Sequence, residues 1–328
     1  MSTYLSALTA TELVKTYSGP RGAARIRALD GLSVEVAAGS VFALLGPNGA
    51  GKSTTIEILE GYRRRDGGDV TVLGLDPGKQ RSQLKRRIGI VLQSTGVDHY
   101  LSVAETIAMY SGYYPHPRPV NEVIELVGLS EKRDTRVVKL SGGQQRRLDV
   151  AIALAGDPEL LFLDEPTTGF DPSARHEAWQ VVKDLAALGK TVLLTTHYMD
   201  EAQYLADRVA VIARGQIVAE GTPATLAGRD AARPTVRYRV ADGVAPPHEL
   251  SGSALPDGSF EFAPEDLTAG LYRLTGWALE HAVNLDRLEI LRPSLEAVYL
   301  QLTDGTSGDP PAAAATAGLR SGTEGPPR

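Results

Sequence analysis

A glycine-rich stretch near the start of the chain has the residue types of a phosphate-binding loop. It consists of Gly46, Pro47, Asn48, Gly49, Ala50, Gly51, Lys52, Ser53 and Thr54. In such a loop the backbone amides bind phosphate oxygens, the lysine reaches the β- and γ-phosphates, and the serine hydroxyl contributes to a Mg²⁺ site. The apolar run 41–45 before it and the segment 54–59 after it predict the strand and the helix that this loop requires. The stretch predicts nucleotide binding and nothing narrower.

A second stretch predicts another anion site. Ser141, Gly142, Gly143 and Gln144 lead into the helical run 145–154, with Ser141 at the N-cap. A glycine-rich helix start presents free N–H groups and the positive end of the helix dipole, which suits a phosphate. Because the first loop already surrounds its own nucleotide, the second site is expected to serve the nucleotide of another subunit.

Acidic and imidazole side chains follow two further apolar runs. Asp164 and Glu165 follow the run 160–163, and His197 follows the run 191–195. Continuously apolar runs are typical of parallel strands covered on both faces, and ligands collect at the carboxyl ends of such strands. Asp164 suits a Mg²⁺ shell and Glu165 suits a general base. The alternative, a solvated acidic pair that caps a turn, is disfavoured by the apolar strand before it and the segment 166–169 after it.

Together the motifs 46–54, 140–144 and 160–166 resemble those of the ATPase subunit of an ABC transporter. The resemblance implies that His197 contacts the γ-phosphate, that Gln93 contacts metal and water and senses a membrane partner, that Tyr17 stacks on adenine, and that Asp171 reaches the other subunit. Ordinary alternatives exist for three of these residues: His197 could be a surface or satisfied buried histidine, Gln93 a polar residue leaving a strand, and Tyr17 a packed aromatic ring.

The family pattern implies ATP and Mg²⁺ as cofactors. Lys52, Glu165 and His197 form the expected catalytic set, and Ser53, Gln93 and Asp164 the expected metal contacts. Since none of these positions is degenerate, two identical chains would form two competent sites, and a head-to-tail homodimer is expected.

Smaller features resemble the ABC-2 type drug and antibiotic exporters, specifically the daunorubicin-resistance-like branch. These features are Phe170 where leucine is more usual, the segment 167–169 before it, and the late segment 293–299. The resemblance implies a separate ABC-2 type membrane permease and a place at the cytoplasmic face of the membrane. The alternatives are an importer, a lipid or polysaccharide export ATPase, and a non-transport ABC ATPase; the last is disfavoured by the single phosphate-binding loop and the absence of long inserts.

Composition limits the remaining classes. The chain has 328 residues, 42% hydrophobic and 23% charged, with a formal net charge of −6 and no cysteine. This balance gives no support for a nucleic-acid partner, and the lack of cysteine excludes disulfides and thiolate metal sites. The first residues lack the pattern of a signal peptide, and no apolar stretch approaches the roughly 20 residues that span a bilayer.

These observations predict an α/β fold: a P-loop NTPase core of the ABC ATPase kind, with an antiparallel β subdomain and a helical subdomain. The predicted ABC ATP-binding domain covers 1–230, with short strands before residue 45 and the helical subdomain at about 94–155. A small α+β accessory domain is expected at 231–303, with Leu295 and Tyr299 in its own core. The segment 304–328, rich in Gly, Pro and Ala, is expected to be disordered.

Overall fold

A six-stranded sheet lies at the centre of the computed structural model, which describes residues 6–18, 25–91, 96–228, 234–241, 244–291, 295–296 and 299–300. The strand order is β5-β6-β7-β3-β8-β9. Their bounds are β3 (Val41–Leu45), β5 (Ile88–Val91), β6 (Leu160–Asp164), β7 (Thr191–Thr196), β8 (Arg208–Ala213) and β9 (Gln216–Gly221). The first five in this order pair in parallel, and β9 pairs antiparallel with β8. The predicted α/β fold class is confirmed.

The central strands are buried on both faces, as their continuously apolar sequences predict. Side chains alternate along β3: Phe42 and Leu44 belong to one hydrophobic core, and Ala43 and Leu45 to another. The pairing is level at the carboxyl ends, where Leu45 lies opposite Thr196 and Asp164 opposite Thr195. The sheet therefore separates two cores and brings the ends of β3, β6 and β7 to one edge.

One core is closed by helix α1 (Lys52–Leu59) and a three-stranded antiparallel sheet of order β2-β1-β4. This sheet comprises β1 (Ser6–Tyr17), β2 (Ile26–Ala37) and β4 (Gly67–Val72). The expectation of short strands here was wrong, because β1 and β2 are continuous across bulges. The register shifts between Ala10 and Val14, where Glu12 has a φ of 51° and the paired strand contains Gly31 with a φ of 78°. Bulges let a long strand bend without ending.

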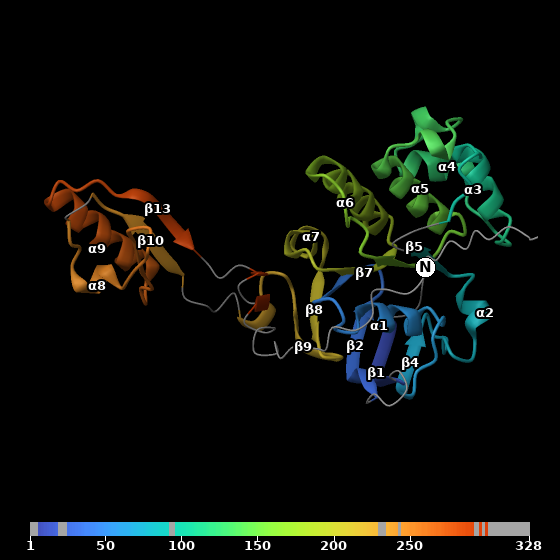
Figure 1. The fold of residues 1–328 in the computed structure, drawn as a ribbon, viewed down its shortest axis with the longest axis horizontal. Coiled ribbons are helices and arrows are strands. Elements are labelled where there is room, and N and C mark those ends of the chain that lie inside the picture. The colour runs from blue at the N-terminus through green and yellow to red at the C-terminus, as the bar shows by residue number, and fades with distance from the viewer. Residues whose placement is uncertain are drawn as a thin grey trace, which may run out of the picture.

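Helices cover the other face of the central sheet (Figure 1). They are α3 (Val103–Ser111), α4 (Val120–Leu126), α5 (Gly142–Leu154), α6 (Pro172–Ala187) and α7 (Met199–Leu205), with 3-10 turns at Ser130–Lys132 and Val137–Lys139. The short helix α2 (Arg81–Leu84) precedes β5. Ile107, Val123 and Leu148 of the helices share one core with the sheet residues Leu161 and Leu163. The helical region is thus packed onto the sheet rather than separate from it.

A second, smaller unit follows residue 234. Its antiparallel sheet has the order β11-β12-β10-β13 and is packed against α9. The elements are β10 (Thr235–Arg239), α8 (His248–Ser251), β11 (Ser253–Ala254), β12 (Ser259–Phe262), α9 (Leu267–Glu280) and β13 (Asp286–Leu291). Figure 1 shows β10, β13, α8 and α9 together, away from the central sheet. This matches the expected α+β composition, and the domain boundary at residue 230 stays a prediction.

Two residues beyond this unit pack elsewhere than expected. Leu295 and Tyr299 are buried in the core that also contains Leu226 and Val211, not in the core of the small unit. Leu295 and Tyr299 therefore pack on the larger body, by which we mean the described residues of 6–228, although they follow the small unit in the sequence. Helical spacing shows that two side chains share a face, but it does not identify the surface that they meet. The predicted disordered segment 304–328 lies outside the described residues.

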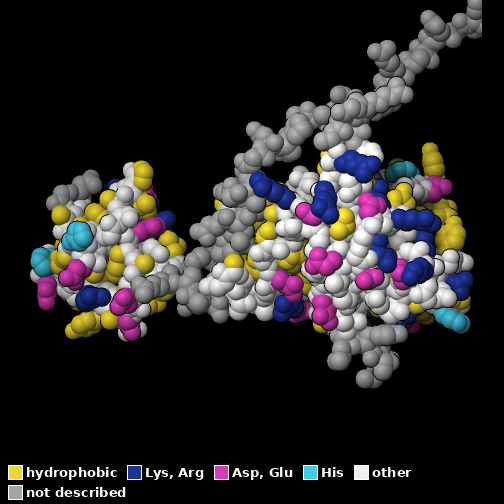
Figure 2. Space-filling model, turned by 90° about the horizontal axis from the view of Figure 1, so that it is seen from below, with side chains coloured by type: hydrophobic (Ala, Val, Ile, Leu, Met, Phe, Trp, Pro, Cys, Tyr) yellow, Lys and Arg dark blue, Asp and Glu magenta, His cyan; other side chains and the backbone are white. Residues whose placement is uncertain are grey.

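The surface of the larger body carries both basic and acidic side chains. On the face seen in Figure 2, Lys and Arg side chains lie among Asp and Glu side chains. Within the described ranges, no helix is long and apolar enough to cross a membrane.

A buried carboxyl group at the end of α1 makes stability depend on pH. Glu60 is 5% exposed, and burial, with a smaller contribution from the charge of Asp164, raises its pKa to about 8. The folded protein therefore holds this proton more tightly than the unfolded chain, so the free energy of unfolding falls as the pH rises from 4.5 toward 8.

Replacing Glu60 with Gln should reduce this loss, because glutamine does not ionise. We expect Glu60→Gln to gain stability over the wild type at about pH 9 more than at about pH 6, measured by denaturant unfolding. Glu35→Gln, at an exposed position on β2, is the control. Parallel stability curves for wild type and Glu60→Gln would contradict the assignment.

Candidate nucleotide-binding and hydrolysis site

The predicted phosphate-binding loop forms the wall of a cavity of about 410 Å³. The lining residues are Ala28, Pro47, Asn48, Gly49, Gly51, Lys52, Ser53, Thr54 and Glu165. Gly51 is the N-cap of α1 and has a φ of 114°, and a Cβ there would lie 2.8 Å from the carbonyl oxygen of Ala28. Glycine is required at this position because a side chain would be both strained and in collision. The loop and the helix start thus leave backbone N–H groups for an anion.

Lys52 places a buried ammonium group in this loop. Its Nζ donates to the carbonyl oxygen of Gly46 at 2.7 Å and lies 3.6 Å from Oε1 of Glu165. Its pKa is lowered because burial outweighs the attraction of Glu165 and Asp164. Phosphate oxygens carry more negative charge than the carbonyl and carboxylate oxygens that Lys52 contacts here. A bound phosphate could therefore replace them as the partner of the ammonium group.

Glu165 lies in the turn directly after β6 and is hydrogen-bonded to β7. It follows β6 with a φ of 46°, a left-handed conformation uncommon for a residue with a side chain. Its backbone N–H donates to both the carbonyl and hydroxyl oxygens of Thr195 on β7, at 3.2 and 3.0 Å. The turn is thereby held by the neighbouring strand, which is how strained conformations persist at functional sites.

The side chain of Glu165 meets the other two catalytic candidates at one oxygen. Oε1 lies 3.6 Å from Nζ of Lys52 and 3.4 Å from Nδ1 of His197. The contact with His197 lacks hydrogen-bond geometry, so Nδ1 is left with no hydrogen-bond partner among the described residues. His197 keeps 35% of its side chain exposed, whereas Glu165 keeps 11%. Lys52, which lies more than a hundred positions before the other two in the sequence, is thus brought together with Glu165 and His197, and their catalytic roles stay a prediction.

Asp164 and Ser53 form the part of the site that suits Mg²⁺. The Asp164 carboxylate accepts a hydrogen bond from the hydroxyl of Thr195, which orients it at the end of β6. Ser53, one residue after Lys52, is exposed and lines the cavity of the phosphate-binding loop. No cluster of three or more His, Cys, Asp or Glu side chains suited to a metal is found among the described residues. Mg²⁺ takes one or two protein ligands together with nucleotide phosphates and water, and Asp164 and Ser53 are oxygen donors of the kind that it prefers.

Tyr17 contacts the first turn of α1. Its hydroxyl lies 3.1 Å from the hydroxyl of Thr54, and the guanidinium of Arg63 lies 5.1 Å from the ring centroid. The position beside the loop is compatible with the predicted contact to a base, which stays a prediction. Gln93 lies outside the described residues.

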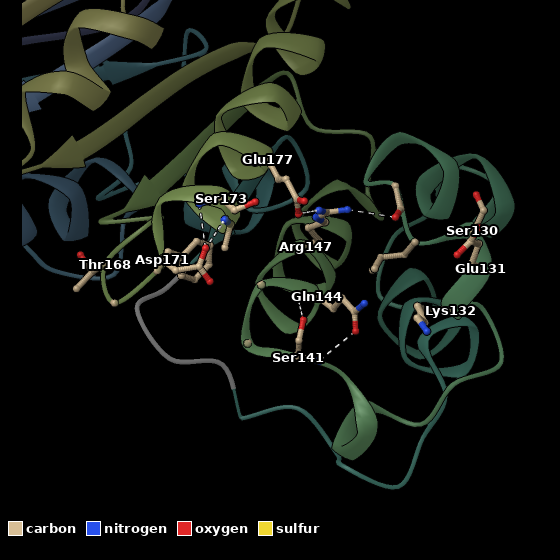
Figure 3. A pocket seen from close by; sticks show the side chains of 17 residues that line it. Ser130, Glu131, Lys132, Ser141, Gln144, Arg147, Thr168, Asp171, Ser173 and Glu177 are labelled. Atoms are coloured by element: carbon tan, nitrogen blue, oxygen red, sulfur yellow. Dashed lines mark hydrogen bonds and ion pairs between the residues drawn. The ribbon is translucent and has the colours of Figure 1, made fainter.

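The second predicted anion site lies in a separate cavity of about 830 Å³ (Figure 3). Ser141 caps α5 as predicted: its hydroxyl accepts from the N–H of Gln144, whose side chain accepts from the N–H of Ser141. The helix begins at Gly142, the residue directly after this cap. In Figure 3, Ser141 and Gln144 lie between Asp171 on one side and Lys132 on the other.

Asp171 belongs to this second cavity rather than to the first. Its carboxylate caps α6 by accepting from the N–H groups of Ser173 and Ala174, both at 2.9 Å. The wall behind it is held by an ion pair between Arg147 of α5 and Glu177 of α6. The two predicted phosphate sites therefore occupy different cavities of one chain, with different residues lining them.

Sequence reasoning missed three residues with hydrogen bonds to Asp164, Glu165 or the turn that follows them: Thr195, Thr168 and Glu201. Thr195 is fully buried and contacts both Asp164 and Glu165, and Thr168 donates to Oε2 of Glu165 at 3.1 Å. Glu201 is fully buried and accepts from Thr167 and Trp179. A threonine directly after the apolar residues 192–194 of β7 was a signal for Thr195. Glu201 gave no signal beyond its place after His197.

The fold and site define an ATPase of the P-loop class. The sequence profile of the family described as ABC transporter matches residues 29–168. The chain is 40% identical over 290 residues to the Nod factor export ATP-binding protein I of Sinorhizobium fredii, covering 84% of this chain and 81% of that protein. This chain belongs to the ABC transporter family and is an ATP-hydrolysing cassette of that family.

Other relatives agree with this placement. The daunorubicin/doxorubicin resistance ATP-binding protein DrrA of Streptomyces peucetius is 45% identical over 226 residues, covering 67% of this chain and 66% of DrrA. The DrrA2 protein of Streptomyces coeruleorubidus is 39% identical, covering 84% of this chain and 90% of DrrA2.

Solved structures share the fold. The ADP conformation of an ATP-binding cassette of an ABC transporter matches with a TM-score of 0.59 and 28% identity, covering 67% of this chain and 92% of that chain. A dimeric ATP-binding cassette in a post-hydrolysis state, bound to ADP and Pi, matches with a TM-score of 0.58 and 25% identity, covering 66% of this chain and 98% of that chain.

Proposed function

We propose that this chain is the ATP-hydrolysing motor subunit of an ABC-2 type exporter. Two copies would close head-to-tail around two ATP molecules and drive a separate membrane permease. The observation that carries the proposal is the position of Glu165: its Oε1 lies within 3.6 Å of both Lys52 and His197. A carboxylate, an ammonium group and an imidazole at the mouth of a phosphate-binding loop are the groups that hydrolysis of a γ-phosphate needs.

In this proposal the residues have separate roles in one displacement. Lys52 and the loop amides bind the phosphates, and Asp164 and Ser53 would hold Mg²⁺, which would supply positive charge to the β- and γ-phosphates. Glu165 accepts a proton from the attacking water as its oxygen bonds to the γ-phosphorus. The bond from that phosphorus to the bridging oxygen breaks and ADP leaves. His197 donates a hydrogen bond to the γ-phosphate.

The second cavity is the reason for proposing a dimer. The amides at the start of α5 lie with Asp171 in a cavity of their own, apart from the cavity that contains Lys52. The start of α5 can bind an anion, but it does not line the cavity in which this chain would bind ATP. It therefore suits the nucleotide bound by a second copy of the chain. The dimeric cassette bound to ADP and Pi supports this arrangement.

Direction and substrate class follow from the named relatives. One relative is named a daunorubicin/doxorubicin resistance ATP-binding protein and another a Nod factor export ATP-binding protein, and these names support our proposal of outward transport, with a drug or antibiotic as the substrate. An importer or a lipid or polysaccharide export ATPase is the alternative. The chain would act at the cytoplasmic face of the membrane, held there by its permease.

Affinity capture would test this proposal. Tagged Glu165→Gln protein with ATP would be recovered from detergent-solubilised membranes of its native host. A stoichiometric permease without a solute-binding receptor would support an export motor. Recovery of a solute-binding receptor with the permease would indicate import, and recovery with ribosomes or DNA-repair proteins and no membrane protein would overturn the transport function.

Lys52 gives a prediction about binding. Replacing it with Ala is expected to weaken ATP binding by at least about tenfold, because a buried charge-assisted contact to phosphate is lost. Titration with a fluorescent ATP analogue would measure the affinity. Lys190→Ala, which loses an ion pair with Asp157 at the opposite edge of the sheet, is the control. Unchanged affinity in Lys52→Ala would contradict the proposed role.

A further inference from the structure

Glu201 is a buried carboxyl group that the proposed chemistry does not use. It lies in α7, has no exposed surface, and accepts two hydrogen bonds at Oε1: from the hydroxyl of Thr167 at 2.8 Å and from the indole N–H of Trp179 at 3.0 Å. Its Oε2 is also buried and has no hydrogen-bond partner among the described residues.

The partners of Glu201 belong to the segments that carry the catalytic groups. Thr167 lies in the turn between Glu165 and Asp171. Trp179 lies in α6, the helix that Asp171 caps. Glu201 itself lies in the first turns of α7, which begins two residues after His197. One carboxylate oxygen thus joins the turn after Glu165, the helix after Asp171 and the helix after His197.

The surroundings of Glu201 make a purely stabilising role a poor explanation. The ring of Trp179 stacks on Tyr204 with centroids 5.1 Å apart, so the carboxyl group sits at an aromatic contact between α6 and α7. The charged groups nearby are Arg146, whose guanidinium donates to the carbonyl oxygens of Pro166 at 3.0 Å and Asp164 at 3.4 Å, and Asp200. Replacing buried charged groups with apolar side chains of similar volume is often neutral or stabilising, so stability alone does not account for a carboxyl group at this place.

We propose that Glu201 is a positioning residue for hydrolysis. By holding Thr167 and Trp179 together, it fixes the turn that carries Glu165 and Asp171 relative to the helix that follows His197. It does not contact the nucleotide cavity. The inference rests on the roles proposed above for Glu165 and His197.

Substitutions at both ends of one hydrogen bond test this inference. Glu201→Ala removes both acceptor contacts, and Thr167→Val removes one donor while keeping its volume. Both are expected to lower kcat by about tenfold or more, because a small displacement of catalytic groups is costly, while KM for ATP stays unchanged. Glu201→Gln keeps an acceptor oxygen at Oε1 and should restore kcat to near the wild-type value.

A matched control separates positioning from general destabilisation. Thr106→Val also removes a buried hydroxyl that donates a hydrogen bond, but in α3. Thermal unfolding of each variant would be measured with kcat and KM. If Glu201→Ala does not fold, then Thr167→Val and Glu201→Gln decide the matter.

Three results would overturn the inference: unchanged kcat in Thr167→Val, an equal loss in Thr106→Val at equal loss of stability, or a KM that rises in step with the fall in kcat. The assignment of the base is tested separately by Glu165→Gln. Wild-type hydrolysis in that variant would refute the proposed chemistry, whatever the outcome at Glu201.

Discussion

Glu165→Gln is expected to reduce ATP turnover by at least about a hundredfold while leaving ATP binding intact. The amide side chain has nearly the same shape but cannot accept the proton of the attacking water. The contacts that hold the backbone of residue 165 come from Thr195 and do not involve the replaced carboxylate. The variant should therefore accumulate with ATP bound, and as a dimer if the site is shared between two chains.

Two measurements on the same sample would check this expectation: phosphate release at saturating ATP and Mg²⁺, and size-exclusion chromatography with and without ATP. Glu220→Gln on β9, which loses an exposed ion pair with Arg208, is the matched control and should hydrolyse ATP normally. Turnover at the wild-type rate in Glu165→Gln would remove Glu165 from the role of base. If Glu165→Gln instead lost its affinity for ATP, Glu165 would have a role in binding ATP.

The second large effect is expected at the other cavity. Ser141→Arg should leave ATP binding by the single chain unchanged, yet abolish ATP-driven dimerisation and reduce turnover by at least about a hundredfold. Ser141 is exposed at the start of α5, so a long side chain fills the cavity where a second nucleotide would meet the helix amides. The cavity with Lys52 is lined by other residues and is not altered.

Loss of the helix cap has to be separated from loss of the cavity. Ser102 caps α3 with the same pair of reciprocal hydrogen bonds, there to Glu105, and lies outside the cavity. Ser102→Arg therefore loses the cap alone, at a cost of about 1 kcal/mol in stability, and should still dimerise and hydrolyse ATP. Monomeric Ser141→Arg that hydrolyses ATP at the wild-type rate would show that one chain forms a complete site.

Much of the site could be predicted because the relevant signals are local in the sequence. The glycines before Lys52, the serine that caps α5 and the carboxylates at the end of β6 can each be recognised from a few neighbouring residues. Parallel strands then bring their carboxyl ends to one edge, which explains why Lys52, Glu165 and His197 meet although they are far apart in sequence. These features depend on residue type, spacing and strand direction alone.

The sequence by itself determined the class of fold, the phosphate-binding loop, the cap of α5 and the candidates for base and metal ligand. Only the tertiary structure decided the left-handed turn at Glu165, the clamp of Thr195 on that turn, and the hydrogen bonds that join Glu201 to Thr167 and Trp179. The physical reason is that these hydrogen bonds join residues 22 to 34 positions apart on different elements. Their partners therefore depend on how the strands and helices pack. The same holds for Leu295 and Tyr299, because an apolar side chain is buried wherever the packed chain offers a surface, and that choice is made by the whole fold.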